Sequence, residues 1–199
     1  MSARDFRTAP APAGESIRAI APADWPLVER LFGPRGACGG CWCMWWRTPG
    51  GKAWTAAKGA PNRARLQALV AADACPAVLA LADGAPVGWC AYGPRGDFPR
   101  LAASRTLDRP DGAPWAVTCL YVRADRRRSG LGTRLLAAAT DAALARGASA
   151  IEGFAVIPKG GARVPAAFAW TGLPAMYEAC GYAPVRPDAG SRRIYRREG

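Results

Sequence analysis

The stretch WAVTCLYVRADRRRSGLGTRLL, Trp115–Leu136, decides the fold of this chain. Its first eight residues, Trp115–Val122, are apolar on both faces, which is typical of a strand buried in the middle of a sheet. Leucines and alanines then recur at helical spacing over Gly132–Arg146, and Gly147 ends this pattern. Three consecutive arginines and two glycines separate the two patterns. The stretch therefore predicts a buried strand, a basic turn and a helix.

The basic turn, Asp125–Gly132, has three interpretations: a nucleic-acid contact, a solvated face or a phosphate cradle. A helix amino terminus carries unpaired N–H groups and a partial positive charge, and it binds phosphate for that reason. Glycine lets a backbone approach an anion closely, and arginine adds bidentate contacts. The spacing matches neither the Gly-x-x-x-x-Gly-Lys-Ser/Thr loop nor the three-glycine dinucleotide fingerprint. The spacing alone leaves the cradle and the solvated loop open.

The remaining chain reads as strands and helices arranged around this stretch. Strands are expected at 16–20, 77–82, 86–92, 150–156, 182–185 and 192–195, helices at 22–32, 61–72 and 173–180, and connectors at 33–59 and 93–114. This order is mixed α/β with one strand–helix–strand unit. The length of 199 residues predicts one domain, 16–199, behind a disordered tail, 1–15.

Composition narrows the class of protein. The formal charge is +12, with 24 of the 27 basic residues being arginine, which suits a polyanionic partner or simple solubility. The chain has no histidine, so it lacks the commonest general base and zinc ligand. It also has no apolar run of the ~20 residues that a membrane span needs, and no secretion signal. We therefore expect a cytoplasmic protein without a membrane partner, whose seven cysteines are reduced.

Leu120–Leu136 resembles the acetyl-CoA signature of the GNAT N-acetyltransferase superfamily. That signature is a strand with the pattern Leu-x-Val, then Arg/Gln-x-x-Gly-x-Gly/Ala, then a helix with a Leu-Leu pair. Arg127, Gly130 and Gly132 take the three signature positions. The later stretch Met176–Tyr182 resembles the second landmark of the superfamily, an aromatic residue on a short helix followed by Gly-aromatic. The resemblance is strong over residues 115–182 and only topological before them.

The resemblance implies a GNAT-like fold for an N-acetyltransferase domain over 16–199. Its central sheet is mixed and mostly antiparallel, with a splayed parallel pair at 115–122 and 150–156, and helices flank it. The opening would expose backbone groups that no neighbour satisfies, and these would hold the pantetheine arm and polarise the thioester. Amides of the turn would cradle the pyrophosphate. The implied cofactor-binding residues are Leu120, Tyr121, Val122, Arg127, Arg128, Ser129, Gly130, Leu131, Gly132 and Thr133.

The implied activity is acyl transfer, of groups other than aminoacyl groups, from acetyl-CoA to a primary amine of a small-molecule acceptor, with a protein or peptide amine left open. Tyr177 matches the family tyrosine near the CoA sulfur and would be the general acid, or would only pack on the pantetheine. The family often has an asparagine where this chain has Trp170, which puts one cofactor hydrogen bond in doubt. Glu152 is the best-placed carboxylate for a general base, or is only a charged strand end. Asp97 is the second candidate for the general base, and water is the remaining acceptor for the proton of the amine.

The connector Cys38–Arg47, CGGCWCMWWR, has the most unusual composition in the chain. By resemblance it would help form the acceptor pocket. Trp42, Trp45 and Trp46 suit an apolar or cationic acceptor, or else they fill the core under a long loop. The thiols of Cys38, Cys41 and Cys43 offer three zinc ligands without a fourth nearby, so no metal is expected. Packing and redox sensitivity remain as their alternative roles.

Two other classes of protein compete with an enzyme. A CoA-binding sensor would keep the cradle and lack a working base. A nucleic-acid binder would use the net charge, but the sequence shows no helix with a continuous basic face and no aromatic–basic sheet motif, so nucleic acid is not an expected partner. A homodimer formed through the terminal hairpin stays open.

Overall fold

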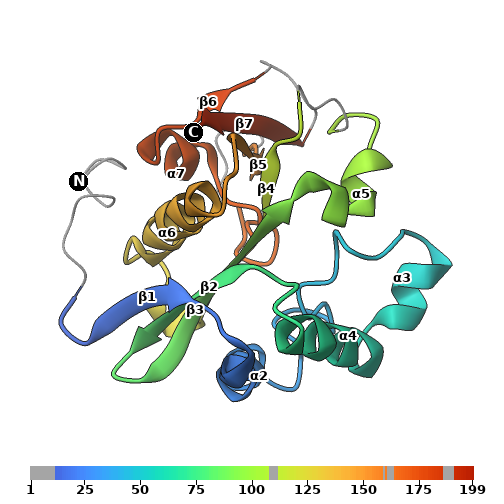
Figure 1. Cartoon of the computed structure of the whole chain (residues 1–199), viewed down its shortest axis with the longest axis vertical. Coiled ribbons are helices and arrows are strands. Elements are labelled where there is room, and N and C mark those ends of the chain that lie inside the picture. Colours follow the sequence, from blue (N-terminus) through green and yellow to red (C-terminus); the bar gives the residue numbers. More distant parts are fainter. Residues whose placement is uncertain (1–11, 108–111, 159, 161–163, 186–190) are drawn as a thin grey trace.

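One mixed sheet organises the molecule. The computed structural model describes residues 12–107, 112–158, 160, 164–185 and 191–199, and within them the sheet order is β1-β2-β3-β4-β5-β7-β6 (Figure 1). The strands are β1 (Glu15–Ala19), β2 (Ala77–Ala82), β3 (Ala85–Pro94), β4 (Trp115–Val122), β5 (Ala150–Val156), β6 (Ala183–Pro184) and β7 (Arg192–Glu198). The pair β4–β5 is parallel and the other neighbouring pairs are antiparallel. The predicted fold class is confirmed.

Helices cover both faces of the sheet. They are α2 (Trp25–Phe32), α3 (Lys52–Ala57), α4 (Ala60–Ala71), α5 (Pro99–Ala102), α6 (Leu131–Ala145) and α7 (Pro174–Ala179), with short 3-10 turns at η1 (Pro22–Asp24), η2 (Arg95–Asp97) and η3 (Ala124–Arg126). In Figure 1, α6 and α7 lie on one side of the sheet and α2 and α4 on the other. The described helices include none that is long and apolar enough to cross a membrane.

The helix α6 follows directly from its sequence pattern. Leu135, Leu136, Ala139 and Ala143 recur at helical spacing, and all four are fully buried against the sheet. Burying them aligns the amino terminus of α6 with the carboxyl end of β4. This alignment places the basic turn at the edge of the sheet where β4 ends.

The strands β4 and β5 separate soon after they pair. Their register holds only from Trp115 opposite Ile151 to Val117 opposite Gly153. Beyond this point β4 continues to Val122 and β5 to Val156, each paired on its other side, to β3 and β7. The predicted splay is therefore confirmed, and a wedge-shaped opening begins at Gly153.

Some predicted boundaries were wrong. The helices α3 and α5 lie inside stretches that the sequence predicts as connectors. Helix α3 buries none of its residues and α5 buries one, so neither has an apolar face that periodicity could reveal. Glu15, expected to end the tail, is the first residue of β1, where Arg134 of α6 pairs with it at 2.7 Å. Residues 1–11 of the predicted tail lie outside the described residues.

Candidate active site

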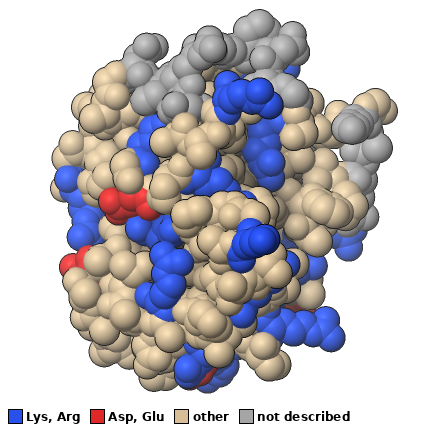
Figure 2. Space-filling view, turned by 90° about the vertical axis from the view of Figure 1, so that its right-hand side faces the viewer, with Lys and Arg blue, Asp and Glu red and all other residues tan. Residues whose placement is uncertain are grey.

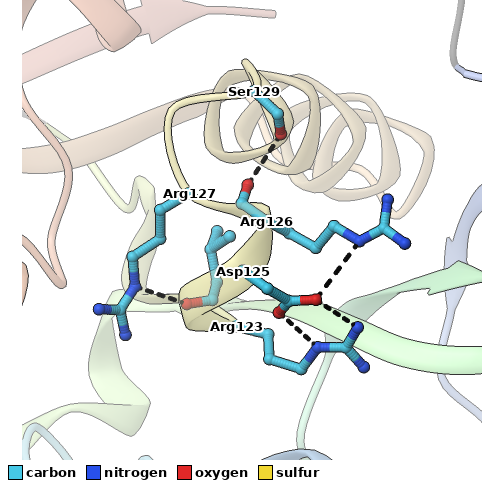
Figure 3. Close-up of polar contacts among 6 residues, drawn as sticks. Arg123, Asp125, Arg126, Arg127 and Ser129 are labelled. Atoms are coloured by element: carbon cyan, nitrogen blue, oxygen red, sulfur yellow. Dashed lines mark hydrogen bonds and ion pairs between the residues drawn. The ribbon is translucent and has the colours of Figure 1, made fainter.

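The arginines of the basic turn, and Arg123 just before it, point in different directions (Figure 3). Arg123 makes two hydrogen bonds of 2.7 Å to the carboxylate of Asp125, and Arg126 lies 3.7 Å from the same carboxylate. Arg127 turns the other way, and its Nε donates to the Val122 carbonyl at 3.0 Å. Arg128 is exposed. Asp125 therefore neutralises part of the charge, while Arg127 and Arg128 keep theirs available to an anion.

The backbone beside these arginines is rich in unpaired donors. Within the described residues, the N–H groups from Arg128 to Gly132 donate no hydrogen bond. Left-handed φ angles of 64° at Arg128 and 79° at Gly130 shape this turn, and glycine allows the second at no steric cost. Five consecutive free N–H groups at a helix amino terminus form the kind of backbone that binds a phosphate. The N–H of Thr133, expected in the cradle, donates instead to the Gly130 carbonyl at 3.0 Å.

Four of the residues expected to bind cofactor place their side chains in the core. Leu120 of β4 and Leu131 and Thr133 of the first turn of α6 are buried, and Tyr121 packs edge-on against Phe32 of α2 at 5.7 Å. These positions offer a ligand their main-chain atoms alone.

A segment of the chain lies in the opening between β4 and β5. The N–H of Leu120 donates to the Trp170 carbonyl at 2.7 Å, and the N–H of Val156 donates to the Gly172 carbonyl at 2.9 Å. We call residues 170–172 the wedge segment, because they bridge the two splayed strands. The expectation that no neighbour satisfies the backbone at the opening is therefore wrong at Leu120.

Two other main-chain groups of β4 accept hydrogen bonds from side chains. The Thr118 carbonyl accepts a hydrogen bond of 2.9 Å from the Trp46 indole, and the Val122 carbonyl accepts the bond from Arg127. Neither bond comes from a neighbouring strand. Beyond the short parallel pairing, no strand among the described residues pairs with this edge of β4, which we call its free edge. Other parts of the chain form hydrogen bonds with it at three points.

Tyr177 lies where the opening begins. Its hydroxyl donates to the Thr171 carbonyl of the wedge segment at 2.7 Å, and its side chain is fully buried. The ring packs directly on Gly153, where an added Cβ would lie 2.0 Å from it. Burial raises the pKa of Tyr177 well above its ordinary value, and nearby Tyr182 raises it further. The phenol therefore keeps its proton throughout the neutral range.

The two candidate bases differ in their surroundings. Glu152 is buried, and its carboxylate lies 2.7 Å from a guanidinium nitrogen of Arg95 and 3.7 Å from Arg196. Paired in this way, Glu152 ties β5 to η2, an arrangement that favours a structural role. Asp97 is 40% exposed and lies 3.4 Å from Arg47.

The three connector tryptophans lie in two places. Trp46 packs against Phe154 of β5 at 5.8 Å and against Trp170 at 5.7 Å, and Trp45 lies 6.1 Å from Trp170. Both therefore flank the wedge segment. Trp42 stacks on Trp25 at 6.0 Å in the core under α2, so we leave it out of the acceptor site.

Tertiary structure adds residues that sequence reasoning missed. Trp54 of α3 meets Trp45 at 4.9 Å, and Arg100 of α5 stands 3.8 Å over the Trp45 ring. Arg192, at the start of β7, stands 5.3 Å over the Trp170 ring. Each of these residues comes from a different element, and no local pattern relates them. The one signal available was Trp170, where the family often has asparagine.

The connector cysteines show no metal site. Cys43 is buried and accepts a hydrogen bond from the Trp89 indole at 3.3 Å, Cys41 is partly buried, and Cys38 is exposed. Over the described residues, no group of three or more His, Cys, Asp or Glu side chains is placed to hold a metal ion. Cys43 thus has a packing role, while the roles of Cys38 and Cys41 stay open.

Solved structures share this fold at low sequence identity. A protein of the GNAT family from Desulfovibrio desulfuricans is 21% identical, with 92% of this chain and 98% of that chain covered and a TM-score of 0.51. The protein yncA from Salmonella typhimurium, solved with its cofactor acetyl-CoA, is 14% identical, covers 93% and 94%, and has a TM-score of 0.54. Ribosomal-protein-S5-alanine acetyltransferase from Vibrio fischeri is 11% identical, covers 94% of both chains, and has a TM-score of 0.51. At these identities the similarity shows the fold alone.

Sequence comparison identifies the family. No curated protein matched the sequence. The family model described as acetyltransferase (GNAT) family matches residues 42–163, which is more than half of the chain and includes the basic turn and both splayed strands. This match agrees with the splayed pair and the row of free N–H groups. The chain therefore belongs to the acetyltransferase (GNAT) family.

Proposed function

We propose that the protein transfers the acetyl group of acetyl-CoA to a primary amine of a small molecule. The observation that carries this proposal is the row of free N–H groups from Arg128 to Gly132 beside the free edge of β4. A pyrophosphate matches the N–H row and the charges of Arg127 and Arg128. The presence of acetyl-CoA in yncA supports the choice of donor.

Residues at the opening fit the three tasks of direct transfer. The amine nitrogen forms a bond to the acetyl carbon, the carbon–sulfur bond breaks, and the sulfur takes up a proton. The Leu120 N–H would stabilise the charge that develops on the carbonyl oxygen, and Tyr177 would supply the proton to sulfur. The ammonium proton would leave to water or to a carboxylate, with Glu152 and Asp97 as candidates.

Melting temperatures test the donor site. We would measure the protein alone, with acetyl-CoA, with free CoA and with ATP. A ligand present at about 100 times its dissociation constant adds about 2.7 kcal/mol to the free energy of unfolding, a rise of roughly 5–10 °C for a chain of this size. Acetyl-CoA should give this rise, and Gly130→Glu should abolish it by placing a carboxylate in the cradle.

Matched variants separate charge from backbone strain. Gln67→Glu adds the same charge on an exposed face of α4 and should keep the full rise. Gly130→Ala strains the left-handed turn without adding charge and should give an intermediate rise. No rise with any of the ligands, from a well-folded protein, would remove the cradle from the proposal.

A sensor that binds CoA without turnover is the second candidate. The Leu120 N–H and the Tyr177 hydroxyl are both bonded to the wedge segment, and this observation favours it. Release of CoA thiol over a panel of amines distinguishes the two functions. The enzyme releases thiol faster with at least one amine than with none, and the sensor never does.

The proposed compartment is the cytoplasm. All seven cysteines are free thiols, which suits a reducing environment. Homodimer formation stays a prediction that gel filtration would check.

A further inference from the structure

A cavity of about 380 Å³ opens beside Trp45 and Trp46, the two tryptophans that pack against Trp170 of the wedge segment. Its wall includes Trp45 and Trp46, and the Trp46 indole is the group bonded to the Thr118 carbonyl on the free edge of β4. Trp46 therefore connects the cavity wall to β4 two residues from Leu120, whose N–H we assign to the thioester carbonyl. Helix α5, which supplies another part of the wall, lies toward the right of Figure 1, the side that Figure 2 turns to the viewer.

The charged side chains among the described residues that line this cavity are both positive. They are Arg100 and Arg192, and the described lining includes no Asp or Glu. Within the described part of the chain, neither arginine has a carboxylate within ion-pair distance. Two nitrogens of the Arg100 guanidinium donate hydrogen bonds to the carbonyls of Thr48 and Pro49, both at 3.0 Å. These bonds fix the position of the side chain.

The two guanidinium groups also lie over the faces of tryptophan rings. Arg100 stands 3.8 Å from the centre of the Trp45 ring, and Arg192 stands 5.9 Å from Trp46 and 5.3 Å from Trp170. A cationic acceptor would compete with these cations for the same rings. Burial lowers the pKa of both arginines, and an anion beside them would favour their charged form.

We propose that this cavity binds the acceptor and that the acceptor carries an anionic group, a carboxylate or a phosphate, in addition to its amine. This inference rests on the proposed function, and it replaces the apolar or cationic acceptor expected from the tryptophans alone. Arg192 holds the anion, Arg100 supplements its field, and the hydroxyls of Ser104 and Thr106 at the cavity wall add neutral donors.

Matched pairs of amines test the charge of the acceptor. We would compare kcat/KM for α-amino acids with their amides, and for phosphoethanolamine with ethanolamine, following the release of CoA thiol. The acid of at least one pair should be preferred at least tenfold, because a charge-assisted hydrogen bond is about that strong. The pair that shows the preference identifies the anion as carboxylate or phosphate.

Variants assign the preference to the cavity. Arg192→Gln should reduce the preference at least tenfold through the KM of the acceptor, with the KM of acetyl-CoA unchanged, and Arg192→Lys should retain part of it. Arg30→Gln removes the same charge from an exposed site on α2 and should change neither constant. The proposal would be overturned if the neutral amines had the same kcat/KM as their acidic partners. It would also be overturned if the Arg192→Gln enzyme kept the full preference.

A binding measurement separates this proposal from the proposed function. Titration calorimetry would compare N-acetylphenylalanine with its amide, and N-acetylphosphoethanolamine with N-acetylethanolamine, on the wild type and on Arg192→Gln. Tighter binding of an acid by the wild type alone supports the anion site even if no amine is acetylated. Equal binding of acid and neutral partner in both pairs rejects it, even if acetylation occurs.

Discussion

At the scale of single residues, Tyr177 shows how a side chain and a glycine depend on each other. The tyrosine ring fits against β5 only because Gly153 lacks a Cβ, and the ring stacks on Tyr195 at 5.5 Å. Its buried hydroxyl has the wedge segment as partner. The Tyr177 side chain is therefore held in one orientation at the point where the two strands diverge. The proposed proton donor to the departing sulfur would need such a fixed orientation.

The substitution Tyr177→Phe tests the acid. It should lower kcat by about 10²-fold or more while leaving the dissociation constant of acetyl-CoA within a few-fold of wild type. Tyr182→Phe is the matched control, because it also removes one buried hydroxyl, here bonded to Thr140 at 2.6 Å. An equal loss of kcat in the two variants would mean that packing, rather than proton transfer, explains the effect.

The surroundings of Glu152 favour a structural ion pair over the general base that the sequence suggested. Removing one partner of a buried ion pair typically costs about 3–5 kcal/mol, because the other charge is left without compensation. Glu152→Gln should therefore lower the free energy of unfolding by about 3 kcal/mol in urea titrations. The pH profile of kcat/KM should keep its acid limb. Loss of that limb with unchanged stability would instead identify Glu152 as the base.

At the scale of elements, the wedge segment occupies a group that the proposed function assigns to the donor. Acetyl-CoA would use the Leu120 N–H, which now donates to the Trp170 carbonyl. The Trp170 ring is anchored by Trp45 and Trp46. Binding of the donor therefore requires this segment to give up at least one backbone hydrogen bond.

Weakening this anchor should tighten donor binding. Aromatic contacts contribute about 0.5–1.5 kcal/mol each, and about 1 kcal/mol taken from the closed state raises the apparent affinity roughly fivefold. We expect Trp170→Ala to bind acetyl-CoA about fivefold more tightly by calorimetry. Trp54→Ala, which also removes an aromatic partner of Trp45, should leave the affinity unchanged. Unchanged or weaker binding by Trp170→Ala would show that the segment does not compete.

At the scale of the whole molecule, charge is spread rather than concentrated. Figure 2 shows lysine and arginine in several separate groups on one face, with few acidic side chains between them. The +12 charge thus does not form a single stripe on this face. Such a surface raises the encounter rate with small anions, among which acetyl-CoA is one.

Buried thiols and phenols make stability sensitive to high pH. Burial raises the pKa of Cys75 to about 12, and it raises the pKa values of Cys90 and Tyr177 well above their ordinary range. These groups ionise in the unfolded chain first, so stability is intact below about pH 8.5 and falls as pH rises toward the folded values. Each unfolded thiol that has ionised lowers the free energy of unfolding by about 1.4 kcal/mol per pH unit.

Urea titrations between pH 7 and pH 10.5, with reductant present, check this dependence. The midpoint should be steady to about pH 8 and then fall. Cys75→Ala should reduce the fall of the midpoint with pH by the contribution of one thiol. A midpoint that stays constant to pH 10.5 would contradict the burial of these groups.

The sequence by itself determined the elements whose pattern is local. The strands Ala77–Ala82, Trp115–Val122 and Ala150–Val156 were predicted at their observed bounds, because apolar runs and turn residues mark them. The basic turn was also readable as a turn between a strand and a helix, because its arginines, glycines and helix start are consecutive. Resemblance to a family then related these elements to a splayed pair and to Tyr177.

Only the tertiary structure decided which distant residues meet. Trp42 and Trp45 are three positions apart, yet left-handed φ angles of 45° at Trp42 and 56° at Cys43 turn the chain between them, and the two rings enter different clusters. Glu152 became an ion-pair partner because Arg95 and Arg196 were brought to it from separate elements. The wedge segment and the arginines of the cavity also depend on packing between residues far apart in sequence. Local patterns record a residue's neighbours along the chain, whereas these contacts are set by how the sheet and helices assemble.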